Sequence, residues 1–412
     1  MRRLAYGLFL CAVAGSVGCA SEGDTDGGPD TCVGKCDSPS GDTPWWSVND
    51  VSIIVPLAKP GETELMPGVA NADGGGALMS KDLWLQIDDA VPLTEGTIAA
   101  IHWPNLRVTS MRFDPCFEQT IPDTSCKRVV RLVAQPIEDL DGSGEVYAID
   151  ASLHLFYRLD DDQFVSMLLA YKQLIGERIP DALYQHPVLS RAGLGSELST
   201  QFNQLISSNL GPDNMFRLTE MATGRSGKNW FWLIYERAED GTYQRALVPT
   251  TPYDQDQFEI SPRTPPQLND IPNFPEKLLF DSYVDGMTEE ELAQAATEIY
   301  AIENPAVVNS TNVKCSMCHV SGRILDYAFN RRGLPLPEDP SFVVPAGQNM
   351  GLRDEALSRL NMHGLGYFRT STAVTRRVVK ESAVVADFLN SDTFAETLSP
   401  SARAVWDAAR EQ

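Results

Sequence analysis

The chain has 412 residues, of which 43% are hydrophobic and 22% are charged, and its formal net charge is −23. This length and composition predict two or three globular domains with sizeable cores. A surface this negative repels phosphate groups, which argues against nucleic-acid binding. No apolar run approaches the roughly 18–20 residues that a membrane-spanning helix needs, and the longest such run is at the very start.

Residues 1–18 have the pattern of a secretion signal that is removed on export. Arg2 and Arg3 precede an uncharged stretch that is too short to span a membrane stably. The segment from Ser16 to Cys19 resembles a bacterial lipobox, which implies cleavage before Cys19 and lipidation of its thiol. Ordinary cleavage a few residues earlier, which would leave a secreted protein without lipid, is the alternative.

The residues after Cys19 point to an anchored location outside the cytoplasm. Ala20 stands where many lipoproteins of the inner membrane have Asp, so the resemblance implies the periplasmic face of the outer membrane or the cell surface. Between Ser21 and Asp42 there are almost no large apolar residues, and such a segment cannot bury enough surface to offset its ordering entropy. Residues 19–47 are therefore expected to form a flexible tether.

Residues 48–261 are predicted to form an α+β domain, with strands toward both ends and helices in the middle. Period-two alternation and helical spacing of apolar residues predict strands at 51–55, 129–133 and 230–234, a hairpin turn at Asp240–Gly241, and helices at 162–174 and 198–207. A proline-rich segment, residues 262–279, is expected to act as a stiff linker.

Apart from Cys11 in the signal and Cys19, the cysteines fall into three local couples. These are Cys32 with Cys36, Cys116 with Cys126, and Cys315 with Cys318. Because an exported compartment permits disulfides, the first two couples are expected to be bridged.

The segment that begins at Asp139 has the residue spacing of an EF-hand calcium loop. Oxygen ligands at alternate positions, with a Gly for the sharp turn, are what Ca²⁺ requires. The ligands would be Asp139, Asp141, Ser143, Glu145 and Asp150. The flanks have the pattern of strands and Pro136 stands where the entering helix should be, so a solvated hairpin turn is the alternative.

Residues 315–319 read Cys-Ser-Met-Cys-His, the pattern of c-type haem attachment. On one helical turn, the thiols of Cys315 and Cys318 can reach the two vinyl groups at one edge of the porphyrin, and His319 then places a nitrogen on the iron. Two other interpretations stay open. The two cysteines could form a small disulfide with His319 incidental, or they could contribute to a zinc site, which would need two more ligands.

Residues 280–412 resemble a class I c-type cytochrome domain, which implies a small all-α fold after the α+β domain. Helical spacing follows a capping-box pattern at Thr288, and an apolar stripe from Val374 to Leu389 fits a packed terminal helix. The resemblance implies that Pro335 orients the proximal histidine and that Met362 is the distal iron ligand. His363, Met350 or an open site are the alternatives for the distal position.

The sequence therefore predicts an exported, lipid-anchored, mono-haem c-type cytochrome that transfers single electrons. Its acidic surface suggests a redox partner protein with a basic face. Two alternatives remain: a haem-free surface lipoprotein with a ligand- or partner-binding N-terminal domain and a disulfide-closed C-terminal module, or a haem enzyme of the peroxidase kind. The other histidines, His102, His154 and His186, are scattered singly and are expected to be structural.

Overall fold

The chain divides after Thr43 into two units, and every residue whose structure is described belongs to the second. The structure is a computed structural model. It describes residues 45–69, 78–80, 83, 105–117, 126–138, 144–149, 151–176, 183–223, 229–246, 258–259, 287–302, 304–305, 315, 318–319, 333–334 and 364–411.

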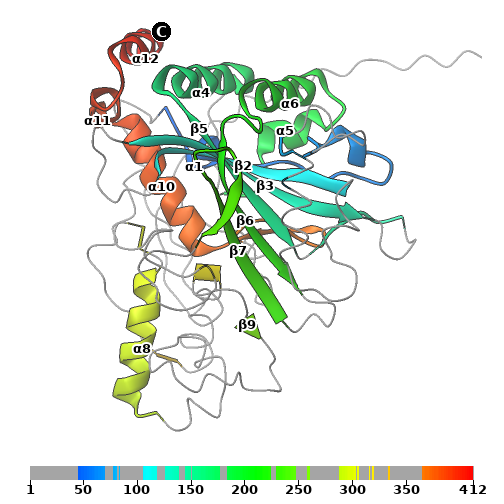
Figure 1. Ribbon diagram of the computed structural model, residues 1–412, viewed down its shortest axis with the longest axis vertical. Helices are drawn as coiled ribbons and strands as arrows, with labels where there is room; N and C mark the ends of the chain where they lie inside the picture. Colours follow the sequence, from blue (N-terminus) through cyan, green and yellow to red (C-terminus); the bar gives the residue numbers. More distant parts are fainter. Residues whose placement is uncertain are drawn as a thin grey trace, which may run out of the picture. The chain divides into compact units, whose positions relative to one another are not determined.

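A large antiparallel sheet organises this unit (Figure 1). Seven strands follow one another in the order β1 (Ser52–Ile54), β2 (Leu106–Phe117), β3 (Lys127–Glu138), β5 (Ser152–Leu159), β6 (Met215–Thr223), β7 (Asn229–Arg237) and β8 (Tyr243–Ala246). Two short strands complete it, because β4 (Tyr147–Ala148) pairs with β3 and β9 (Phe258–Glu259) pairs with β7. The predicted turn at Asp240–Gly241 is confirmed, since β7 and β8 pair on either side of it and Gly241 has a φ of 85°.

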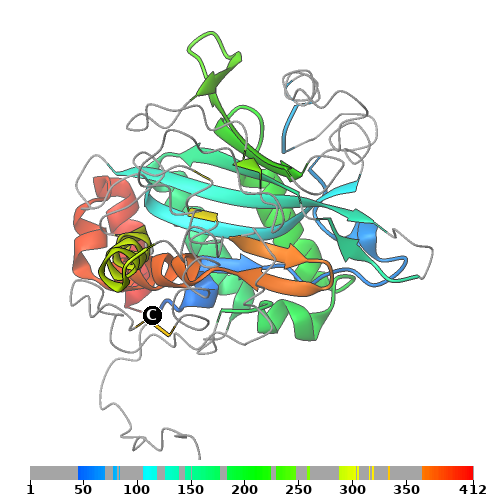
Figure 2. The ribbon, with the colours of Figure 1, turned by 90° about the horizontal axis from the view of Figure 1, so that it is seen from below.

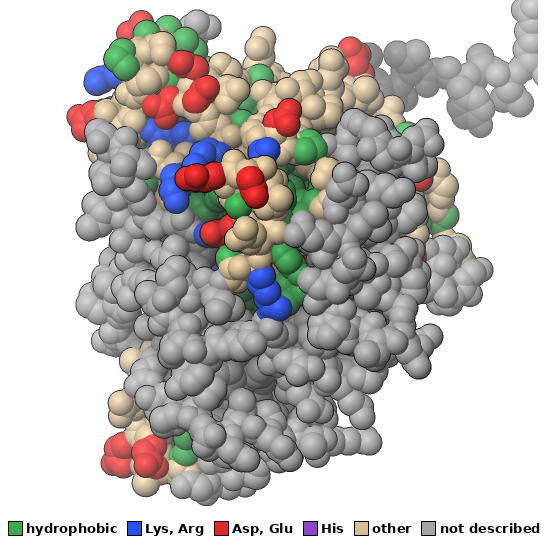
Figure 3. Space-filling model, in the orientation of Figure 1, with side chains coloured by type: hydrophobic (Ala, Val, Ile, Leu, Met, Phe, Trp, Pro, Cys, Tyr) green, Lys and Arg blue, Asp and Glu red, His purple; other side chains and the backbone are tan. Residues whose placement is uncertain are grey.

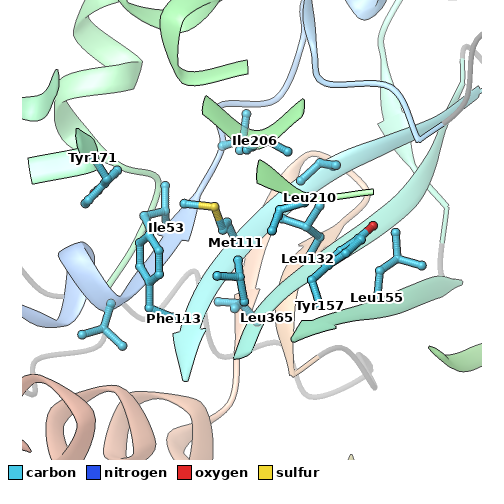
Figure 4. Close-up of a cluster of buried hydrophobic side chains, with 14 of the residues drawn as sticks. Ile53, Met111, Phe113, Leu132, Leu155, Tyr157, Tyr171, Ile206, Leu210 and Leu365 are labelled. Carbon is cyan, nitrogen blue, oxygen red and sulfur yellow. The ribbon is translucent and has the colours of Figure 1, made fainter. Parts of the chain in front are cut away.

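Three helices between β5 and β6 pack on one face of the sheet (Figure 2). They are α4 (Asp161–Ile175), α5 (Pro187–Ala192) and α6 (Glu197–Asn209). A capping box of Asp160 and Gln163 begins α4, and Gly176, in the left-handed conformation at φ 69°, ends it. The rings of Phe164 and Tyr171 on α4 contact Phe113 of β2 in the hydrophobic core that Figure 4 shows in close-up.

The two faces of the sheet differ because successive side chains of a strand point to opposite sides. Leu155 of β5, Leu218 of β6 and Leu233 of β7 belong to the main core beneath the helices. Their neighbours in sequence face the other side. We call this second side the motif face and define it by His154 of β5, Arg217 of β6 and Trp232 of β7.

The C-terminal residues add a hairpin and three helices to the same core. The hairpin consists of β10 (Leu365–Phe368) and β11 (Ser371–Val374), and the helices are α10 (Arg376–Asn390), α11 (Asp392–Glu396) and α12 (Pro400–Arg410). Ser399 caps α12 and Pro400 occupies its first turn, where its fixed φ and missing N–H are tolerated. At the other end of the described chain lie α1 (Val48–Val51), which packs on α10, and the short 3₁₀ helix η1 (Thr63–Leu65).

The expectation of an α+β domain followed by a separate, small all-α cytochrome-like domain is wrong. The main core runs without interruption from Trp46 to Trp406, whose rings stack 6.0 Å apart. The backbone N–H of Trp46 donates to Asn390 Oδ1 at 2.9 Å, and Gln135 of β3 exchanges two hydrogen bonds of 2.8 Å with the backbone of Tyr367 in the hairpin. The predicted stripe from Val374 to Leu389 is only partly helical, because Val374 belongs to β11 and α10 begins at Arg376. Periodicity identifies an apolar face without identifying what covers it.

The helix α8 (Glu289–Ile302) begins as predicted, with reciprocal hydrogen bonds between Thr288 and Glu291. Lys380 of α10 lies 4.7 Å from the centre of the Tyr300 ring near the other end of α8. Among the residues that the structure describes, no helix is both long and apolar enough to cross a bilayer.

Candidate functional site

His319 of the Cys-x-x-Cys-His motif lies against the motif face of the sheet, and Cys315 is close enough to Arg217 of that face to be affected by its charge. Cys315, Cys318 and His319 all have helical backbone conformation and are half-buried. The two thiols are not joined in a disulfide. Helical spacing places residues three and four apart on the same side of the backbone, so both sulfurs and the imidazole can serve one bound group.

The His319 ring has aromatic neighbours on two strands of the sheet. Its centre lies 6.2 Å from the centre of the Trp232 ring on β7 and 6.2 Å from the centre of the His154 ring on β5. Trp232 is only 2% exposed, whereas His154 is half-buried. The strands therefore present one indole and one imidazole to the motif histidine.

The two strand residues reach the same place because of the sheet register. His154 is paired with Thr219 of β6, and Trp232 is paired with Met221 of the same strand. Thr219 and Met221 are two positions apart, so they lie on the same face of β6. His154 and Trp232 therefore share the motif face, although β6 separates their strands.

The Cys315 thiol is held in its neutral form. Burial raises its pKa to about 12, the neighbouring Cys318 contributes in the same direction, and the positive charge of Arg217 opposes the rise only in part. Since the thiolate is the nucleophilic form of cysteine, such a thiol is poorly suited to nucleophilic or disulfide-exchange catalysis.

A buried cluster of charges connects the motif to the C-terminal helix α10. Burial by itself would lower the pKa of Arg377, but Glu381 and Cys318 together raise it. Glu381 accepts charge-assisted hydrogen bonds from Arg377 at 2.6 Å and from Arg112 of β2 at 2.7 Å. Arg112 also bonds to Asp114 at 2.7 Å. The positive groups beside the motif are thus matched by carboxylates, which keeps this buried region close to neutral.

The described part of the chain offers this donor set to a bound group: two thiols, a motif imidazole and a second imidazole on the sheet. The chemistry of this set fits a covalently attached haem, which needs two thiols for its vinyl groups and at least one imidazole for its iron. No cluster of three or more His, Cys, Asp or Glu side chains arranged for a bare metal ion occurs among the described residues.

The other predicted site residues are distributed as follows. Cys116 and Cys126 form a disulfide that closes the connection between β2 and β3. Glu145 of the EF-hand-like loop accepts a hydrogen bond of 3.0 Å from the Tyr147 hydroxyl. The remaining candidates, Asp139, Asp141, Ser143, Asp150, Pro335, Met350, Met362, His363, Cys19, Cys32 and Cys36, lie outside the described residues.

Sequence reasoning missed the contributions of His154, Trp232, Arg217 and Arg377 to this site. Trp232 was recognised only as part of an alternating strand, and His154 only as a single structural histidine. The available signal was weak: His154, Arg217 and Trp232 lie on strands with the alternation of a two-faced sheet, and Arg377 lies in the first turn of α10. That pattern does not reveal the register between strands or which segment covers the second face.

Comparisons of the chain with protein-family models, with curated proteins and with solved structures each found no match.

Proposed function

We propose that this protein is an exported, lipid-anchored c-type cytochrome that carries one covalently bound haem and passes single electrons. The observation that carries the proposal is the motif itself: Cys315, Cys318 and His319 on helical backbone, with both thiols unbridged and the imidazole packed against the sheet. The proposal concerns the attachment chemistry and does not depend on a cytochrome-like fold.

The proposed roles follow from the chemistry of each side chain. Each motif thiol adds across one vinyl C=C bond of the porphyrin: the sulfur bonds to one carbon, the thiol hydrogen goes to the other, and no oxidant is consumed. His319 provides the proximal nitrogen, and the Trp232 indole, almost fully buried beside it, helps to exclude water. When bound, the haem iron accepts and releases one electron between its ferric and ferrous states.

Electrons would be exchanged with a partner protein that has a basic face. The net charge of −23 favours such an encounter, which would be weak and sensitive to salt. Glu289, Glu290 and Glu291 form an exposed acidic group at the start of α8, at the lower left of Figure 3. Over the upper part of that view, acidic and basic side chains are interspersed. Electron exchange with a cationic partner should therefore slow as ionic strength rises, and a rate independent of salt would contradict this part of the proposal.

Covalent haem is tested on the full chain, produced with its own signal in a bacterium that attaches c-type haem. We expect colour that survives acid–acetone extraction and a peptide spanning 315–319 that carries the mass of one haem. A variant with Cys315→Ala and Cys318→Ala should lose the colour. As the matched control, Cys116→Ala with Cys126→Ala removes two cysteines outside the motif and should leave the haem attached.

Colourless exported protein in which Cys315 and Cys318 are joined to each other would refute the proposal. That result would favour the haem-free lipoprotein with a disulfide-closed C-terminal module. Lipidation is checked separately, because Cys19→Ala should release the protein from the membrane fraction without affecting the haem. Membrane association that persists in this variant would contradict the proposed anchor.

A further inference from the structure

A second histidine lies beside the motif histidine, and it belongs to a distant part of the sequence. His154 is in the middle of β5, which lies between β3 and β6 in the sheet. On the motif face its cross-strand neighbours are Val133, which is 1% exposed, and Thr219. The imidazole is thus a polar, half-buried side chain on a strand whose other side chains, apart from the exposed Arg158, are buried, and its ring lies beside that of His319.

The separation of the two imidazoles matches the one expected for a pair of ligands on opposite sides of a single metal. An imidazole nitrogen lies about 2.0–2.1 Å from a bound first-row metal and roughly 1.2 Å from the centre of its own ring, so two ligands in line have ring centres about 6.5 Å apart. The centres of the His154 and His319 rings are 6.2 Å apart, with 52° between the ring planes.

We propose that His154 is the second axial ligand of the haem iron, opposite His319. This assignment rests on the proposed function, since it requires a haem at the motif. It replaces Met362, His363 and Met350 as the distal ligand. The iron would then link the central strand β5 to the motif segment, and the sheet would supply one of the two side chains that bind the iron and set its reduction potential.

The assignment has a consequence for the reduction potential. Methionine opposite histidine raises the potential of c-type haem, whereas a second neutral imidazole does not have this effect. The protein should therefore operate at a lower potential than a histidine–methionine cytochrome. Exogenous ligands should bind the iron slowly, because a strand in the interior of the sheet holds His154 in place.

The test compares variants of the full chain, matured with haem in an export-competent host. The measurements on ferric protein are the near-infrared charge-transfer band, the low-temperature electron paramagnetic resonance spectrum and the midpoint potential. His154→Ala should lose the bis-imidazole signature and regain it when free imidazole is added. His154→Met should acquire the red-edge sulfur-to-iron band and a higher midpoint potential.

Two controls separate ligation from packing. Thr219→Ala alters the residue directly opposite His154 on β6 and should leave all three measurements unchanged. Met362→Ala removes the rival ligand and should also leave them unchanged. Far-ultraviolet circular dichroism and the urea midpoint of each variant show whether it has folded, and the recovery with imidazole shows that the haem pocket of His154→Ala is intact.

The outcomes distinguish the two proposals. If haem is attached but the spectra of His154→Ala and His154→Met equal those of the unmodified chain, the ligand assignment is overturned and the cytochrome proposal stands. If Met362→Ala is the only variant that loses the sixth-ligand signature, the assignment of His154 is again overturned and the cytochrome proposal stands. If no haem is attached to the unmodified chain, both proposals are overturned.

Discussion

The Glu381 carboxylate provides a strong test of how the C-terminal helix is held to the sheet. It is 20% exposed and bonds to Arg112 of β2 and to Arg377 of its own helix. Burial alone would raise its pKa, but the charges of Arg377, Arg112 and Arg131 outweigh burial and lower the pKa from 4.5 to about 2. Each pKa unit between the folded and unfolded states corresponds to about 1.4 kcal/mol.

This shift predicts that Glu381→Gln lowers the free energy of unfolding by about 3 kcal/mol at pH 7. The loss of one partner from a buried ion pair is expected to cost about 3–5 kcal/mol, which agrees with that figure. Because the folded-state pKa lies below the unfolded-state pKa, the contribution is complete above pH 4.5 and disappears as the pH falls through about 2. The difference between the two proteins should therefore shrink across that range.

The assay is urea unfolding followed by tryptophan fluorescence, at a series of pH values from neutral to the lowest at which the chain stays folded. Asp407→Asn is the control: its i,i+4 pair with Arg403, at 3.5 Å, is about half exposed and should contribute no more than about 0.5 kcal/mol. If Glu381→Gln cost no more than Asp407→Asn, or if its cost were the same at pH 3 as at pH 7, the charge cluster would not stabilise the fold as argued.

Three further predictions concern the packing of the unit. Gly366 has a φ of 149° and any Cβ there would overlap Gln135 Oε1, so Gly366→Ala should lower the free energy of unfolding by about 1–3 kcal/mol; an unchanged urea midpoint would contradict this. His186 is buried, which, with the charge of Lys172, lowers its pKa to about 3; its imidazole should stay neutral in nuclear magnetic resonance titrations until about that pH. The contribution of the neutral His186 side chain to the free energy of unfolding should be complete above its unfolded-state pKa of about 6.5 and should decline as the pH falls toward 3. A His186 resonance that titrated near pH 6.5 in the folded protein would contradict the lowered pKa. Trp406 is fully buried and stacked on Trp46, so Trp406→Ala should lower the free energy of unfolding by about 3–5 kcal/mol. In a double-mutant cycle, additive losses for Trp406→Ala and Trp46→Ala would show that the two rings do not share one core.

The amino-acid sequence by itself determined the local elements and the chemical nature of the motif. Apolar periodicity located α4 and α6, strand alternation located β3 and β7, and cap residues predicted the start of α8. These signals are local, because a helix or strand repeats its buried positions at a fixed spacing and its caps lie within one turn. The spacing of Cys315, Cys318 and His319 is equally local, and it alone suggested haem attachment.

Only the tertiary structure decided which elements share a core and which side chains meet the motif. The stripe on α10 fitted a small helical domain as well as it fitted its place beside α1 and β2. His154 and Trp232 approach His319 because the register of β5, β6 and β7 places them on one face of the sheet. Hydrophobic burial is not directional, so an apolar face accepts any complementary partner. The choice among partners depends on contacts between residues far apart in the chain, which no local pattern encodes.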